Sequence, residues 1–267
     1  MVSIEEHRAR KRFGQNFLVD AFWIEKLASA IGASPADDIV EIGPGKAALT
    51  RKLLDAAGHL RVVEIDRDLA SWLRSEFPAT ALEVIEADAL TVDWKSLARD
   101  GRKLRIVGNL PYNISSPLLF TLLEVANVVS DQHFMLQREV VDRMAARAGS
   151  KTYGRLSVML QLTYRITKLF DVPAGAFRPI PAVTSAFVRM KPKTPEEIPA
   201  VNREDFALLV AKAFSQRRKT LRNALSEILT ENAIRAADVD PTARAEAVDL
   251  AGFVRLTNQY TTSKENS

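Results

Sequence analysis

Four consecutive residues near the middle of the chain carry the side chains needed to hold a flat base with an exocyclic amine. They are Asn109, Leu110, Pro111 and Tyr112, which supply an amide, a rigid turn and an aromatic ring. The apolar run at residues 104–107 predicts a buried strand that delivers this tetrapeptide to the edge of a sheet. Asn and Pro also form ordinary strand-to-helix turns, so the tetrapeptide alone leaves a purely structural role open.

A glycine-containing turn upstream predicts a second part of the same site. The apolar run at residues 39–42 leads into Gly43-Pro44-Gly45 and then into a helical pattern, and glycine lets backbone approach a ligand closely. Another apolar run ends at Glu64, which lies 19 residues after Gly45. An acid at about that spacing binds the ribose hydroxyls of a nucleotide-like cofactor.

Further acids indicate which cofactor this is. Glu41 precedes the turn, where it would repel a pyrophosphate but would suit the ammonium and sulfonium groups of S-adenosylmethionine. Ala48 replaces the third glycine of a dinucleotide fingerprint, an allowed change, and the sequence contains no P-loop string. Asp88 follows a third predicted strand and is either a hydrogen-bond acceptor for an adenine amine or a helix N-cap.

Together with other segments, these motifs resemble the bacterial 16S rRNA adenine dimethyltransferases of the KsgA type. The resemblance runs from about Arg10 to about Leu225 in the family's order. One departure is Ala47, where the family often has glycine. The segments that carry the resemblance are residues 12–18, 41–45, 64–66, 88–90, 109–115, 153–158, 177–183 and 217–221.

The resemblance implies the fold, the reaction and the partner. We expect an α/β fold, a Rossmann-like seven-stranded methyltransferase sheet with a small C-terminal all-helical domain. The cofactor would be S-adenosyl-L-methionine, and the substrate would be two adjacent adenines near the 3′ end of 16S rRNA, dimethylated at N6. The RNA would be presented in the small (30S) ribosomal subunit or its precursor, with a role in subunit biogenesis. We expect a cytoplasmic monomer.

The resemblance also assigns roles to individual residues. Asn109, with the backbone carbonyl of Leu110 just before Pro111, would accept hydrogen bonds from the adenine amine, and Tyr112 would stack on the base. Phe177 would close the opposite face, although an ordinary core aromatic is an equal alternative for it. The predicted cofactor-binding residues are Asn16, Leu18, Gly43, Gly45, Glu64, Asp88 and Asn109.

Charge and proline content divide the chain. We expect a basic arm at residues 1–20, a methyltransferase domain at 21–191, a charged, proline-rich linker at 192–201 and a helical RNA-binding domain at 202–267. Two basic clusters would contact phosphates, although such clusters are often only solvated faces. Their residues are Arg10, Lys11, Arg12, Arg217, Arg218, Lys219 and Arg222.

Composition excludes several classes of function. The chain has no cysteine, which excludes disulfides, thiolate metal sites and the cysteine nucleophile of cytosine C5 methylation. Its 3 histidines are scattered, so we expect no metal site. We also expect no membrane segment and no secretory signal. The net charge of +4 permits binding to nucleic acid.

Three alternatives share part of the pattern. One is the related class that methylates 23S rRNA adenine and confers antibiotic resistance, whose C-terminal region differs from this one. Another is a DNA adenine methyltransferase, which usually has Pro-Pro in the tetrapeptide and needs a sequence-reading domain. A third is an RNA-binding assembly factor that uses the fold without catalysis; the intact Asn109 and Tyr112 argue against this one.

Overall fold

The apolar runs of the sequence form neighbouring strands of one sheet in a computed structural model that describes residues 10, 14–99, 101–216 and 218–265. Five strands are parallel, and most of their apolar residues are buried because helices cover both faces of the sheet. These strands are β2 (Asp38–Ile42), β3 (Leu60–Glu64), β4 (Leu82–Glu86), β5 (Leu104–Asn109) and β6 (Val129–Gln137).

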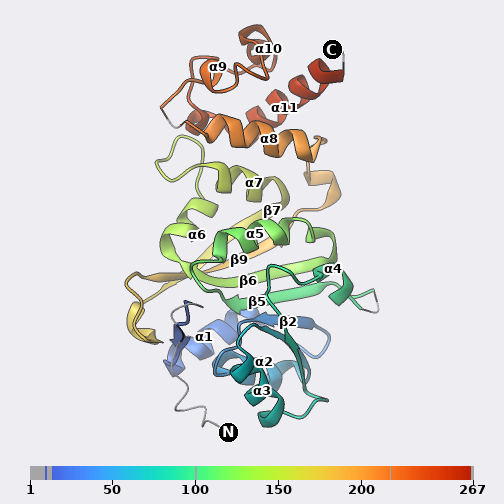
Figure 1. The fold of residues 1–267 in the computed structure, drawn as a ribbon, viewed down its shortest axis with the longest axis vertical. Helices are drawn as coiled ribbons and strands as arrows, with labels where there is room; N and C mark the ends of the chain where they lie inside the picture. The colour runs from blue at the N-terminus through green and yellow to red at the C-terminus, as the bar shows by residue number, and fades with distance from the viewer. Residues whose placement is uncertain (1–9, 11–13, 100, 217, 266–267) are drawn as a thin grey trace. The chain divides into compact units, whose positions relative to one another are not determined.

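Two more strands complete the sheet, whose order is β4-β3-β2-β5-β6-β9-β7. β9 (Ser185–Pro192) pairs antiparallel with β6, and β7 (Tyr164–Val172) lies beyond it. A separate two-stranded pairing joins β1 (Phe17–Leu18) to β8 (Phe177–Arg178). The predicted α/β sheet of seven strands is therefore confirmed, and Figure 1 shows the strands running from blue β2 through green β6 to gold β9.

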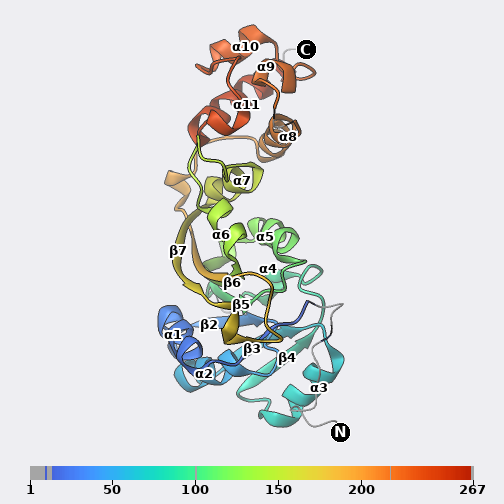
Figure 2. The same cartoon turned by 90° about the vertical axis from the view of Figure 1, so that its left-hand side faces the viewer.

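Helices flank the sheet on both sides. Figure 2 shows α1 and α2 on one side and α4 and α5 on the other. The face under α1 and α2 is a continuous apolar core that includes Leu27, Leu53, Val62 and Val107. The helices of this part are α1 (Ala21–Ile31), α2 (Ala48–Ala57), α3 (Arg67–Glu76), α4 (Trp94–Leu97), α5 (Ser115–Leu123) and α6 (Arg138–Met144).

The chain forms two compact units. One comprises Met1–Val141 and Ile166–Pro192, and the other comprises Asp142–Arg165 and Lys193–Ser267. The second has its own apolar core and contains α7 (Arg155–Thr163), α8 (Arg203–Phe214), α9 (Leu221–Ala224), α10 (Glu231–Ala236) and α11 (Leu250–Glu265). Short 3₁₀ turns lie at Ala126–Val128, Ala174–Ala176, Pro195–Glu197 and Ala245–Ala247.

These two units differ from the domain limits expected from sequence. Residues 142–165 group with the helical unit, whereas their position before the proline-rich segment placed them in the methyltransferase domain. The reason is packing: Val158 and Leu162 on α7 are buried in the same core as Phe206 and Leu209 on α8. The composition of a linker carries no information about packing between residues that are far apart in the sequence, so it could not predict this boundary.

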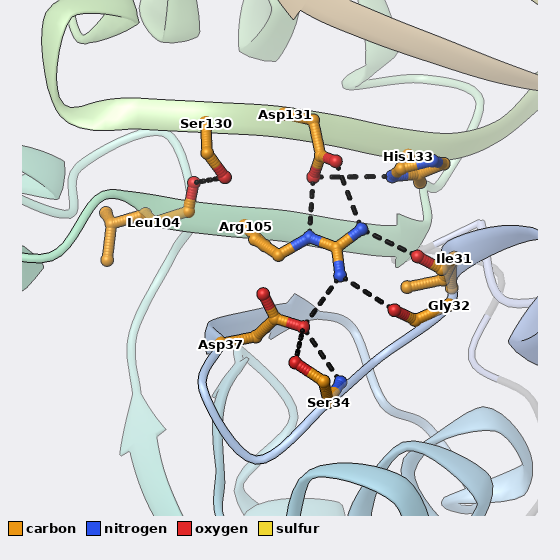
Figure 3. Close-up of polar contacts among 9 residues, drawn as sticks. All are labelled: Ile31, Gly32, Ser34, Asp37, Leu104, Arg105, Ser130, Asp131 and His133. Atoms are coloured by element: carbon orange, nitrogen blue, oxygen red, sulfur yellow. Dashed lines mark hydrogen bonds and ion pairs between the residues drawn. The ribbon is translucent and has the colours of Figure 1, made fainter.

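Arg105 fixes the start of β5, at the opposite end of this strand from the tetrapeptide. Its guanidinium donates hydrogen bonds to both carboxylate oxygens of Asp131 on β6, at 2.9 and 3.0 Å, and to Asp37 at 2.9 Å. It also donates to the carbonyls of Ile31 and Gly32 at the end of α1, as Figure 3 shows. One side chain thus ties β5 to β6, to α1 and to the segment that enters β2.

The charge of Asp131 persists despite its partial burial. Burial raises the pKa of this carboxyl group, but nearby His133 and the hydrogen bonds from Arg105 outweigh that effect and lower the pKa to about 2. A lowered carboxyl pKa stabilises the fold above the ordinary value of 3.8 and ceases to do so as pH falls through about 2. The anchor around Arg105 is therefore intact throughout the neutral range.

We predict that Gly108→Ala destabilises the sheet at the β2–β5 pairing. A methyl group at this position would lie 2.6 Å from the carbonyl oxygen of Ile42, which is backbone and cannot rotate away. Overpacking of this kind costs about 1–3 kcal/mol. Urea unfolding should show that loss for Gly108→Ala and none for Gly175→Ala, whose added methyl would have no atom within 4 Å. Equal stability of the two variants would contradict the tight approach of the strands.

Candidate active site

A cavity of about 330 Å³ lies at the carboxyl ends of β2, β3 and β5. The chain runs from β2 outward to β3 and β4, then crosses back to β5 and β6, so the strand order reverses between β2 and β5. Open parallel sheets bind ligands at such a reversal. The two predicted halves of the site, the glycine turn after β2 and the tetrapeptide after β5, both line this cavity.

The backbone of both turns is held by the neighbouring strand. The Gly43 N–H donates to the carbonyl of Val63 on β3 at 2.9 Å. The Leu110 N–H donates to the carbonyl of Met135 on β6 at 3.1 Å. The sheet ladder therefore continues one residue into each turn, which fixes the cavity walls.

The glycine turn has the conformation that its sequence requires. Gly45 has a φ of 56°, and a methyl group on it would lie 2.9 Å from the ring of Phe17. Ala47, the departure from the family pattern, also has a positive φ, of 62°. That left-handed conformation costs roughly 1–2 kcal/mol for a residue with a β-carbon, whereas glycine adopts it readily.

Two buried carboxylates lie at the ends of the adjacent strands β2 and β3. Glu41 is 2% exposed, and its Oε2 accepts a hydrogen bond of 2.6 Å from the Thr50 hydroxyl on α2. Glu64 is 4% exposed, and its Oε1 accepts the backbone N–H of Asp66 at 2.9 Å. The other oxygen of Glu64 lies 3.4 Å from the backbone nitrogen of Gly45, which donates to it.

Burial raises the pKa of both carboxyl groups to about 7. For Glu41 the hydrogen bond from Thr50 opposes this rise, and the charge of Glu64 adds to it. For Glu64 the backbone N–H donors oppose it, and the charge of Asp66 adds to it. Ionisation of Glu41 and Glu64 is therefore unfavourable in this cavity, and a ligand that is cationic or donates hydrogen bonds would favour it.

The side chain of Asn109 is oriented by the segment before β1. Its Nδ2 donates to the backbone carbonyl of Asn16 at 2.9 Å. A carbonyl oxygen only accepts, so this contact identifies which end of the amide is nitrogen. The Asn109 Oδ1 is therefore the end that remains to accept a hydrogen bond from a substrate amine.

Tyr112 lines the cavity with its hydroxyl held at one end. Its oxygen is 2.8 Å from the Ser185 hydroxyl at the start of β9. Burial raises the pKa of this phenol, although the Ser185 contact opposes the shift, so the ring is neutral at physiological pH. Pro111 lines the same wall, and its carbonyl accepts from the Ser115 hydroxyl at 2.9 Å at the start of α5.

The remaining predicted cofactor residues also reach the cavity. Asn16, Leu18 and Asp88 all line it. The Asp88 carboxylate also accepts the backbone N–H of Leu90 at 2.9 Å, so it closes a local turn as well as facing the cavity. The structure thus gathers every residue predicted to bind cofactor around one cavity, and their individual roles stay predictions.

Phe177 is placed differently from its predicted stacking role. Its side chain is fully buried in the core under α1 and α2 and does not line the cavity. The pairing of β8 with β1 directs this apolar ring inward, where burial stabilises it. The alternative of a core aromatic describes Phe177 in this structure.

The predicted phosphate-binding residues fall into three groups. Arg10 is ion-paired with Asp66 and Asp68. Arg218, Lys219 and Arg222 are exposed in the helical unit, and Arg222 lies 3.7 Å from Glu231. Lys11, Arg12 and Arg217 lie outside the described residues.

Sequence reasoning missed several residues that shape the site. Thr50, Gln15, Phe17 and Ser185 contact or line it through partners distant in sequence. Gln15 and Phe17 lie within the segment 12–18 that carries the resemblance, and Thr50 lies in the first turn of the helix that follows the glycine turn, whereas Ser185 had no detectable signal. Within the described residues there is no cluster of three potential metal ligands and no helix able to cross a membrane.

Comparisons with known proteins agree with this geometry. The family model "Ribosomal RNA adenine dimethylase" matches residues 6–262. Curated proteins named ribosomal RNA small subunit methyltransferase A are similar to the chain, at 54% identity in Bordetella petrii and 52% in Acinetobacter baylyi. These matches cover 96% of this chain and 96% and 93% of the two relatives.

Solved structures resemble it as well. A dimethyladenosine transferase from Plasmodium falciparum has a TM-score of 0.79 at 25% identity, covering 93% of this chain and 98% of that one. The 23S rRNA methyltransferase ErmE has a TM-score of 0.70 at 26% identity, covering 92% and 100%. Given a family model that spans nearly the whole sequence and relatives more than half identical over nearly their full lengths, this chain belongs to the ribosomal RNA adenine dimethylase family.

Proposed function

We propose that this chain transfers methyl groups from S-adenosyl-L-methionine to N6 of two adjacent adenines near the 3′ end of 16S rRNA. The observation that carries the proposal is the oriented Asn109 amide, which shares one cavity with two buried carboxylates at the reversal of strand order. The small-subunit substrate is favoured over 23S rRNA because the relatives named for the small subunit are 51–56% identical, against 26% for ErmE.

The cavity fits the cofactor. Glu41 and Glu64 are buried acids whose ionised forms require a cation or hydroxyl donors, which an amino-acid ammonium and a ribose supply. Gly43 and Gly45 let the ligand approach the backbone, and Asn16, Leu18 and Asp88 would complete the site. When bound, S-adenosylmethionine supplies an electrophilic methyl group on a sulfonium.

The tetrapeptide would prepare the adenine amine for attack. The lone pair of N6 is delocalised into the ring, so the amine is a poor nucleophile. A hydrogen bond from the amine to the Asn109 Oδ1, and another to the Leu110 carbonyl, would favour a pyramidal nitrogen. The backbone N–H of Leu110 is already bonded to β6, which holds that carbonyl in place. The protein's contribution is then alignment and electrostatics.

Tyr112 would hold the base by stacking, which is worth roughly 1–3 kcal/mol per base. The Ser185 contact fixes the ring before the base arrives. We assign no stacking role to Phe177, because its ring is buried in the core and does not line the cavity. The target adenine must leave its helix, or be presented unpaired, to enter such a cavity.

The reaction itself is the most direct test. Labelled cofactor should modify small subunits that lack the methyl groups, and mapping should find two adjacent adenines. Large subunits and DNA serve as the alternative substrates. Methylation of the large subunit instead would move the assignment to the ErmE-like activity, and binding without methylation would favour an assembly factor.

We further propose that the protein is a cytoplasmic monomer. Sedimentation of the purified protein would test its oligomeric state.

We predict that Asn109→Ala abolishes methyl transfer and leaves RNA binding nearly intact. The amide would act mainly in the transition state, so kcat should fall about 100-fold or more while affinity changes little. Single-turnover methylation and a filter-binding measurement on the same preparation give the two values. Turnover within about twofold of the parent would remove Asn109 from the catalytic role.

We predict that cofactor affinity rises with pH between about 6 and 8. A cationic ligand binds the ionised forms of Glu41 and Glu64, whose pKa values near 7 leave both partly protonated in the free protein, so binding must release protons. Calorimetry in buffers of different ionisation enthalpy measures that release. A pH-independent affinity without proton release would contradict the assignment of these carboxylates.

The raised pKa values of Glu41 and Glu64 also affect the free energy of unfolding. Their effect with pH is opposite to that of Asp131, whose pKa is lowered by its partners. Between the ordinary pKa of 4.5 and about 7, the native state keeps protons that the unfolded state has lost. These two residues therefore make the protein less stable as pH rises through that window when cofactor is absent. Excess cofactor should reduce this dependence, which thermal unfolding at several pH values would record.

We predict that replacing Arg217, Arg218, Lys219 and Arg222 by alanine weakens binding to the small subunit. Removing each charge that neutralises a phosphate should reduce the slope of log affinity against log salt by about 0.7–0.9. Cofactor affinity should stay unchanged, because the members of the cluster that the structure describes, Arg218, Lys219 and Arg222, do not line the cavity. A quadruple variant with the parent's salt slope would mean that the cluster only solvates its surface.

A further inference from the structure

Asp66 is the centre of a group of contacts that joins Arg10 and Gln15 to the cavity. Its side chain is fully buried, and one oxygen accepts from the Arg10 guanidinium at 2.8 Å. The other oxygen accepts from the Gln15 amide at 3.3 Å. Gln15 in turn accepts the backbone N–H of Arg10 at 2.8 Å. Arg10 and Gln15 thus hold one buried carboxylate from two sides.

The backbone of Asp66 carries this contact to Glu64. The Asp66 N–H donates to Glu64 Oε1 at 2.9 Å, which is shorter than the 3.4 Å contact from the Gly45 N–H to the other oxygen. Asp66 also caps α3 by accepting the N–H of Asp68 at 3.1 Å. A shift of Asp66 would therefore move both the start of α3 and the carboxylate that faces the cavity.

We propose that Arg10 is a positioning residue for cofactor binding, which acts through Asp66 to hold Glu64 in place for the cofactor's ribose. This rests on the role proposed above for Glu64. It also gives Arg10 a different function from the phosphate contact that its basic neighbours suggest. Because coupling is reciprocal, bound cofactor should in turn hold residues 14–18 more firmly, and these include Asn16, which orients Asn109.

The chemistry of arginine suits this position. Its planar guanidinium contacts Asp66 with one nitrogen and Asp68 with another, which lysine cannot do with a single nitrogen. Three carboxylates lie within five residues here, those of Glu64, Asp66 and Asp68. The negative charge of Asp66 raises the pKa of Glu64 and so disfavours its ionisation. Arg10 forms an ion pair with the Asp66 carboxylate that exerts this repulsion. Its contact with Asp68, which is 64% exposed, contributes little.

The test compares four variants by cofactor affinity and steady-state kinetics. Arg10→Ala should weaken cofactor binding at least about fivefold, the low end of typical coupling between sites. The KM for cofactor should rise, and kcat at saturating cofactor should change little. Arg10→Lys should recover part of the loss. Arg67→Ala is the matched control, because this arginine is 88% exposed at the start of α3 and pairs with Glu86 rather than with Asp66. Glu64→Ala reports on the proposed site itself.

A double-mutant cycle shows whether Arg10 acts through Asp66. Asp66→Asn keeps the cap and removes the charge, so in that background Arg10→Ala should change cofactor affinity by less than about twofold. Thermal unfolding of each variant checks that it is folded. An Arg10→Ala variant with normal cofactor affinity, or one equally impaired in both backgrounds, would overturn the proposal. Normal affinity in Glu64→Ala would instead overturn the ribose assignment on which it rests.

Discussion

The burial of two carboxylates at the ends of adjacent parallel strands is the constraint on which the site depends. Glu41 and Glu64 are nearly inaccessible, and each is stabilised by few donors. Burying such groups without a full set of partners is costly. The fold bears that cost because β2 and β3 are fixed on both sides by the sheet, so the acids cannot relax toward water. The result is a cavity prepared for a ligand that brings positive charge and hydroxyl groups.

The position of Asn109, which is proposed to bind the base, depends on how β5 is held in the sheet. Arg105 anchors the start of β5 to β6 and α1, and Gly108 lets β5 approach β2 closely (Figure 3). These contacts set where β5 ends, and Asn109 is its last residue. A shift of one residue in this pairing would turn the Asn109 side chain to the other face of the sheet. The position of the Asn109 amide therefore depends on contacts along the whole of β5, from Arg105 near its start to Gly108 beside Asn109.

The segment before β1 connects the two halves of the cavity. The backbone carbonyl of Asn16 orients the Asn109 amide. The next residue, Phe17 at the start of β1, packs against Gly45 in the glycine turn. Neither interaction involves neighbours in sequence. This one segment therefore contributes to both sides of the site, the glycine turn expected to bind cofactor and the Asn109 amide expected to bind the base.

The sequence by itself determined the parts whose information is local. Apolar runs, the glycine turn, the acid 19 residues later and the tetrapeptide predicted the sheet and placed Glu64 and Asn109 at its edge. Only the tertiary structure decided which side chains meet. It buried Phe177, because β8 pairs with β1, and it moved residues 142–165 into the helical unit. It paired Arg10 with Asp66, which lies 56 residues further along the chain. Such contacts depend on packing between distant segments, and no pattern within a short window records them.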